Sequence, residues 1–104
     1  MRLTNHRIFD EFRLPATHWA ILLAASYYLP SLFKEFMFEV ELEQEGNFSA
    51  DELLVALASC IRQGWIIQHE YGIVLTDEGR YLKEEISTAL LHPIYVLRET
   101  VDSD

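Results

Sequence analysis

The clearest hydrophobic pattern in the chain is a helical one that lies between Ser49 and Gly64. Apolar side chains recur there at three- and four-residue spacing, which places them on one side of a helix: Leu53, Leu54, Leu57, Cys60 and Ile61. Ser49 and Glu52 have the spacing of a capping box, in which side chains satisfy N–H groups left free at a helix start. Gly64 stands where a left-handed residue can end a helix. The pattern predicts a helix over residues 50–63.

After this helix the pattern changes to that of two short strands. Residues 65–67 and 73–75 are apolar runs, and residues 70–72 predict the turn of a hairpin between them. Thr76 can then cap a helix over residues 77–91, whose first two residues are acidic and suit the positive end of the helix dipole. The apolar stripe predicted for this helix consists of Tyr81, Leu82, Ile86, Ala89 and Leu90.

The longest uncharged stretch, residues 14–33, is apolar on nearly all sides at its centre. It predicts a helix that begins near Pro15 and ends at about Leu29, before Pro30. Prolines and polar residues dilute the stretch, so a buried helix fits it better than a membrane-spanning one. A helix that is apolar all round must be covered on all sides. A central position in the core or a dimer interface would do this, and the candidate dimer surface consists of Trp19, Tyr27 and Tyr28.

Residues 31–44 carry two conflicting periodicities. Ser31 can cap a helix here, and helical spacing relates one set of apolar residues: Leu32, Phe33, Phe36, Met37 and Val40. Strand alternation relates another set, with glutamates between its members: Phe36, Phe38, Val40 and Leu42. The residue pattern alone leaves both a helix and a strand open.

Two short motifs follow the capped helix and the hairpin. They are Gly64-Trp65-Ile66 and Leu75-Thr76-Asp77-Glu78-Gly79-Arg80. With its elements in this order, the chain resembles, over about residues 17–90, the winged helix-turn-helix domains of MarR-type and PadR-type bacterial transcriptional regulators. The resemblance implies a mainly α fold with a small β-hairpin wing (α+β), and it favours a helix for residues 31–44.

The resemblance also implies a set of functional residues. In these families the capped helix enters the DNA major groove and the hairpin contacts the adjacent backbone. Carried over to this sequence, the recognition-helix or partner surface consists of Ser49, Ala50, Asp51, Glu52 and Arg62. The wing consists of His69, Glu70, Tyr71 and Gly72. A long C-terminal helix commonly pairs subunits in the related families, so the resemblance implies a homodimer.

Acidic residues dominate the chain, with 17 Asp and Glu against 8 Lys and Arg and a formal net charge of −9. No basic residue occurs between Lys34 and Arg62, whereas acidic residues are frequent there: Glu35, Glu39, Glu41, Glu43, Glu45, Asp51 and Glu52. Affinity for DNA rests largely on Lys and Arg side chains that neutralise phosphates. The surface predicted for the second and third helices therefore opposes DNA binding.

At 104 residues the chain predicts a single winged-helix domain. Its parts are an N-terminal arm over residues 1–15, a core over residues 16–91 and a C-terminal tail over residues 92–104. The arm contains a small group of basic residues: Arg2, His6, Arg7 and Arg13. Packing of the arm on the domain or on a partner subunit is one interpretation, and contact with DNA is the other.

Residues suited to catalysis or metal binding are sparse. Cys60 is the single cysteine, which excludes an internal disulfide and a cysteine-based zinc site, and its place on the apolar side predicts a buried thiol. The histidines show no pair at metal-ligand spacing: His6, His18, His69 and His92. No phosphate-binding glycine loop or catalytic triad context occurs. We therefore expect no enzyme activity, cofactor or metal, and the lack of a secretory signal predicts a cytoplasmic protein.

The leading hypothesis is a non-enzymatic winged-helix protein of regulatory type that acts through protein–protein contacts, with another copy of itself or with a basic partner. The reason for this hypothesis is the acidic surface predicted for the second and third helices. The alternative is a dimeric DNA-binding transcriptional regulator, whose candidate contacts are Arg62 and the amino-terminal arginines. A third hypothesis is that the acidic surface mimics DNA and occupies a nucleic-acid-binding protein. The sequence indicates no membrane partner and no small-molecule substrate.

Overall fold

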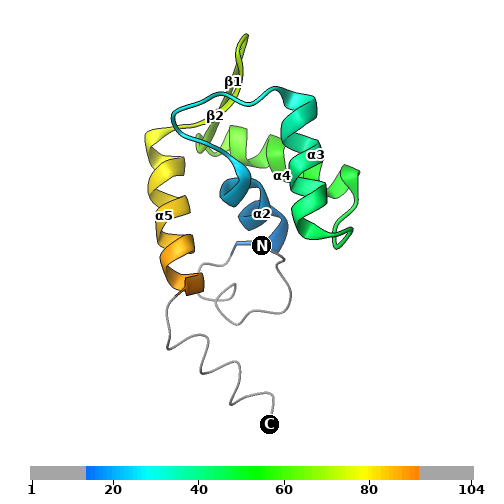
Figure 1. Ribbon diagram of the computed structural model, residues 1–104. Helices are drawn as coiled ribbons and strands as arrows, with labels where there is room; N and C mark the ends of the chain where they lie inside the picture. Colours follow the sequence, from blue (N-terminus) through cyan, green and yellow to red (C-terminus); the bar gives the residue numbers. More distant parts are fainter. Residues whose placement is uncertain (1–13, 92–104) are drawn as a thin grey trace.

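The computed structural model describes residues 14–91, and within this range it contains four helices and one two-stranded antiparallel sheet. In chain order the elements are α2 (Ala16–Ala24), α3 (Phe33–Gln44), α4 (Ala50–Arg62), β1 (Ile66–His69), β2 (Gly72–Leu75) and α5 (Asp77–Leu91). Three helices, a β-hairpin and a further helix make a winged-helix-like α+β arrangement (Figure 1). The predicted fold class is confirmed. The predicted tail, and the predicted arm except for Leu14 and Pro15, lie outside the described residues.

Helix α2 forms the centre of the core. It contacts α3, α4 and α5, and Figure 1 shows it between α5 on one side and α3 on the other. Trp19, Ile21 and Leu22 are each 0% exposed. The other elements of the same chain therefore supply the cover that this apolar helix needs. Trp19 is wrong as a dimer-surface residue, because it lies inside the core where a second chain cannot reach it.

Helix α2 is shorter than predicted. It ends at Ala24 rather than at about Leu29. The chain then runs alongside β2, where the backbone of Ser31 exchanges two hydrogen bonds with that of Ile73, 2.9 and 2.8 Å long. This pairing requires an extended backbone, so the segment that leads to it cannot continue the helix. Contacts with a strand far away in the sequence thus hold the segment that follows α2 in an extended form.

Residues 33–44 form α3, so the helical alternative for this segment is confirmed. Its buried residues follow helical spacing: Phe36, Met37, Val40 and Gln44. Phe38 and Leu42 face away from the core and are 64% and 65% exposed. The prediction that Ser31 caps this helix is wrong, because the backbone of Ser31 is paired with β2. The N-cap position is Leu32, whose side chain makes no capping hydrogen bond.

Both ends of α4 are as predicted. Ser49 Oγ accepts a hydrogen bond from the Glu52 backbone N–H over 3.1 Å, and the Ser49 hydroxyl donates to the Glu52 carboxylate over 3.2 Å. At the other end Gly64 is left-handed, with φ of +81°. Its N–H donates to the Ile61 carbonyl over 3.1 Å, and the following N–H donates to the Cys60 carbonyl over 3.0 Å. This pair of bonds is a Schellman motif, which ends the helix and directs the chain into β1.

The buried side of α4 is turned slightly from the predicted one. Leu53, Leu57 and Cys60 are buried as predicted, but Ala56 lies in the core and Leu54 does not. The run of adjacent apolar residues at the start of the helix fits both orientations, so spacing alone did not distinguish them. Burial raises the pKa of the Cys60 thiol to about 12. The thiol therefore stays protonated at neutral pH, and the prediction of a buried thiol is confirmed.

Helix α5 begins and ends where predicted. Thr76 caps it, with its Oγ1 accepting a hydrogen bond from the Gly79 N–H over 3.0 Å. Ile86 and Leu90 lie on its buried side as predicted, but Tyr81 is 70% exposed and was wrongly placed there. Gly79 is buried instead, because the first turn of α5 packs directly against the backbone that joins α4 to β1.

Candidate functional site

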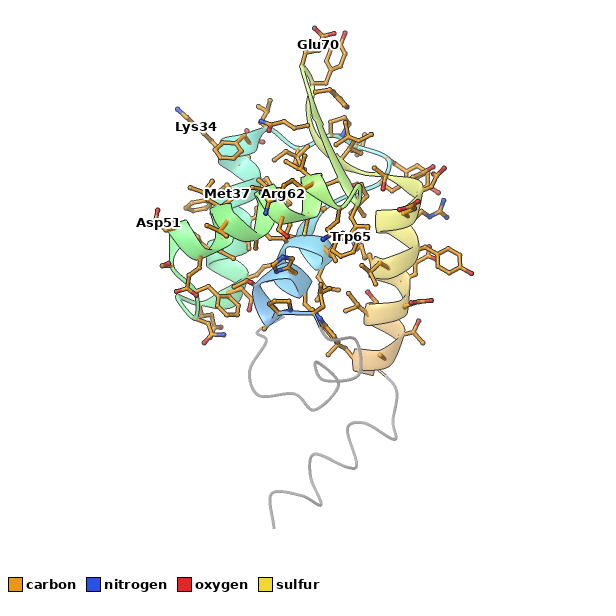
Figure 2. The ribbon with its side chains drawn as sticks, turned by 180° about the vertical axis from the view of Figure 1, so that it is seen from behind. Lys34, Met37, Asp51, Arg62, Trp65 and Glu70 are labelled. Atoms are coloured by element: carbon orange, nitrogen blue, oxygen red, sulfur yellow. The ribbon has the colours of Figure 1, made fainter. Side chains whose placement is uncertain are left out.

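The outer side of α4 is the surface that the resemblance assigns to recognition. The residues predicted there are all exposed: Ser49, Ala50, Asp51, Glu52 and Arg62. Figure 2 shows α4 from this side, with Asp51 near its start and Arg62 near its end. Between them the outer side is apolar, since Leu54, Val55 and Ala58 are exposed and Val55 is 66% exposed. The helix thus presents carboxylates first, then apolar side chains, then one cation.

The basic residues of the range 14–91 are not gathered on α3 and α4. They are Lys34, Arg62, Arg80 and Lys83, and the last two belong to α5. Lys34 projects from the start of α3 away from the other helices (Figure 2). Burial lowers the pKa of His18 on α2, and the positive charge of Arg62 lowers it further. Among the described residues, α3 and α4 therefore offer no row of cations for a phosphate backbone.

The wing presents a carboxylate and an aromatic side chain. Glu70 lies at the tip of the hairpin (Figure 2). The Tyr71 N–H donates to His69 Nδ1 over 3.1 Å, and the two rings pack edge to face with their centroids 5.8 Å apart. Gly72 has φ of +126°, and a Cβ there would overlap the backbone carbonyl of Ser31. The structure brings the four predicted wing residues together, but it places no cation at the tip.

The outer side of α3 contains a site that sequence reasoning missed. Phe38 and Leu42, one helical turn apart, border a hollow of about 440 Å³ at the end of the helix. Glu41, Glu45 and Gly46 complete its lining. In the sequence, only the acidic character of this region was apparent. The signal that could have revealed the site is the spacing of Phe38 and Leu42 by four residues, once the segment is taken as a helix.

The electrostatics of this hollow favour positive charge. Glu41 and Glu45 supply carboxylates to its walls, and the C-terminal end of α3 adds the negative end of the helix dipole. Glu39 and Glu43 are exposed on the same helix. Phe38 and Leu42 supply apolar surface to the same hollow. The arrangement suits a long cationic side chain, whose stem can cover apolar surface while its charged end reaches a carboxylate.

The candidate dimer surface is not a single surface. Trp19 lies in the core, whereas Tyr27 and Tyr28 lie in the connection from α2 to α3. The Tyr27 hydroxyl donates to Asp77 Oδ1 over 2.5 Å, and the Arg80 guanidinium lies 4.7 Å from the centre of the Tyr27 ring. Tyr27 is therefore held against the start of α5. Tyr28 remains largely exposed.

No protein-family model, curated protein or solved structure matches this chain. Among residues 14–91, no three His, Cys, Asp or Glu side chains are grouped so that they could hold a metal ion. In the same part of the chain, no helix has both the length and the apolar character needed to cross a membrane.

Proposed function

We propose that this protein is a non-enzymatic winged-helix module, similar in its order of elements to MarR-type and PadR-type regulators, that works by binding another protein. The partner segment that we propose is a basic amphipathic helix, which lies on the outer side of α3. The observation that carries the proposal is the exposed pair Phe38 and Leu42 beside a hollow with carboxylates on its walls.

The apolar pair supplies the first part of the binding free energy. Phe38 and Leu42 lie one helical turn apart and are largely exposed, so together they offer a partner one patch of apolar surface. Fully burying a Leu or Phe side chain is worth about 1.5–3 kcal/mol. Covering Phe38 and Leu42 together therefore provides a substantial share of the ~8 kcal/mol that corresponds to micromolar affinity. A leucine or similar side chain of the partner would contact both.

The carboxylates supply the second part of the binding free energy, and they determine the kind of partner. Glu41 and Glu45 line the same hollow as this apolar pair, so Lys or Arg residues beside the partner's apolar stripe would meet opposite charge. Such charge complementarity raises the rate of association and excludes acidic partners. It also disfavours a second copy of this chain, because two surfaces from a protein of net charge −9 would bring like charges together. A basic partner is therefore favoured over self-association.

A fluorescein-labelled peptide of leucine and lysine, with leucines at helical spacing, tests this proposal by fluorescence anisotropy. We expect saturable binding that weakens with salt. The double variant Phe38→Ser/Leu42→Ser should bind at least about tenfold more weakly, because about 1.4 kcal/mol of lost apolar contact already corresponds to that factor. Both side chains are exposed, so this variant should remain folded.

The matched control is Tyr81→Ser, which removes a similarly exposed aromatic side chain from α5. This variant should bind the peptide like the unchanged protein. A second control is the same peptide with glutamate in place of lysine, which should not bind. Equal affinity of the Phe38→Ser/Leu42→Ser variant and the unchanged protein would contradict the proposal, as would equal binding of the acidic peptide.

The second candidate function is a DNA-binding regulator. The order of elements favours it, because α4 is exposed along one side and precedes a hairpin, as a recognition helix does. The residues on that side oppose it, since Asp51 and Glu52 stand at the beginning and Val55 in the middle. Arg62 is its best-placed candidate contact with a phosphate or a base edge.

A further inference from the structure

A second cavity, of about 530 Å³, lies between the α2–α3 connection and α5. This volume is in the range of small-molecule sites. Its walls combine two cations with several hydroxyl groups: Arg80, Lys83, Tyr28, Ser87 and Thr88. Of the four basic residues in the range 14–91, two thus line one cavity in a chain that is otherwise strongly acidic. The cavity is formed by elements other than α3, so it is independent of the partner site proposed above.

Lys83 places a partly buried ammonium group at this cavity. Its Nζ donates a hydrogen bond to the Ala25 carbonyl over 2.5 Å, which anchors the side chain to the end of α2. An ammonium group has three donors, so further donors remain for a ligand. Burial lowers the pKa of Lys83, and the charge of Glu43 partly offsets this effect. An anion bound beside Nζ would compensate for the lost hydration of the charge.

Arg80, which precedes Lys83 by one turn of α5, is also held in place. Its Nε donates to Glu84 Oε1 over 3.2 Å, and its guanidinium lies 4.7 and 5.5 Å from the ring centres of Tyr27 and Tyr28. These contacts fix the plane of the guanidinium, which can still donate hydrogen bonds through its terminal nitrogens. Glu84 is the one carboxylate among the described residues that line the cavity, and it is already engaged with Arg80.

We infer that this cavity binds a small molecule through an oxyanion group, phosphate or carboxylate, held between Lys83 and Arg80. The hydroxyls of Ser87 and Thr88, about one helical turn beyond Lys83 along α5, supply hydrogen bonds to the same group or to the body of the ligand. Because α5 and the end of α2 both contribute, a bound ligand would join the C-terminal helix to the centre of the core.

Amide chemical-shift titration of the full chain with inorganic phosphate, and separately with acetate, tests this inference at constant ionic strength. We expect saturable shifts at residues 26–28 and 80–88 with at least one of the two anions. The anion that binds more tightly shows whether the ligand's oxyanion group is a phosphate or a carboxylate. Lys83→Met should weaken binding at least tenfold. Lys34→Met, which removes an exposed lysine outside the cavity, should leave it unchanged.

Lys83→Met also removes the partner of the Ala25 carbonyl, so Arg80→Gln serves as a second variant that keeps that hydrogen bond. It should likewise weaken binding several-fold while the spectrum stays dispersed. The inference is overturned if both anions give only linear shifts, the same as sodium chloride, or if Lys34→Met weakens binding as much as Lys83→Met and Arg80→Gln do.

Discussion

Replacing Phe36 by alanine should lower the free energy of unfolding by about 3–5 kcal/mol, the usual cost of removing a buried aromatic side chain. Phe36 is 0% exposed and lies on the side of α3 that faces the core. Phe38, two residues further along the same helix, is 64% exposed, and its replacement by alanine should change stability by no more than about 0.5 kcal/mol. Urea denaturation of the two variants beside the unchanged protein provides the comparison.

This matched pair tests how α3 is oriented. In the strand interpretation Phe36 and Phe38 lie on the same side, so both substitutions would cost similar amounts. In the helix they lie on different sides, and the two costs differ by several kcal/mol. A loss of stability for Phe38→Ala as large as that for Phe36→Ala would contradict the orientation of α3. It would also remove the basis for a partner site at Phe38.

Gly79→Ala should lower the free energy of unfolding by at least about 2 kcal/mol, in the range known for overpacked sites. Helix propensity alone predicts the opposite, since alanine is favoured over glycine inside a helix by about 1 kcal/mol. A Cβ at Gly79, however, would overlap the backbone carbonyl oxygen of Trp65 and approach the Leu75 side chain to 3.1 Å. That carbonyl also accepts a hydrogen bond from the Thr76 N–H, so it cannot move freely.

Gly64→Ala is the control for this experiment. At Gly64 a Cβ has open space around it, and only the left-handed φ of +81° opposes the substitution. Its cost should be about 1–2 kcal/mol, the ordinary penalty for a left-handed residue with a side chain. Thermal unfolding of both variants gives the comparison. A stabilised Gly79→Ala variant would show that α5 does not start against the Trp65 backbone.

The parts of the fold that the sequence predicted well are those set by a few neighbouring residues. The capping residues Ser49 and Thr76 and the left-handed Gly64 fixed the ends of α4 and the start of α5. The end of α2 was not predictable in this way, because the segment that follows it is held by backbone contacts with β2, a distant part of the chain. The buried side of α4 was ambiguous for a different reason, since adjacent apolar residues satisfy two orientations.

The candidate sites likewise combine features set by neighbouring residues with features set by contacts between distant segments. The acidic character of α3 and of the start of α4 follows directly from the sequence. The hollow beside Phe38 does not follow from the sequence, because it requires both that α3 is a helix and that its outer side is not covered by another described element. The cavity at Lys83 joins residues 26–28 to residues 80–88, and no local pattern relates segments so far apart.

We expect this winged-helix-like chain to bind protein rather than DNA. Fluorescence anisotropy of a labelled mixed-sequence DNA duplex, titrated with the full chain at low and then at physiological salt, tests this expectation. We predict no binding at either salt concentration, because carboxylates and apolar side chains occupy the outer side of α4. A dissociation constant of roughly 10⁻⁴ to 10⁻⁶ M that rises steeply with salt is the behaviour of a DNA-binding protein. That result would contradict the expectation and favour the regulator.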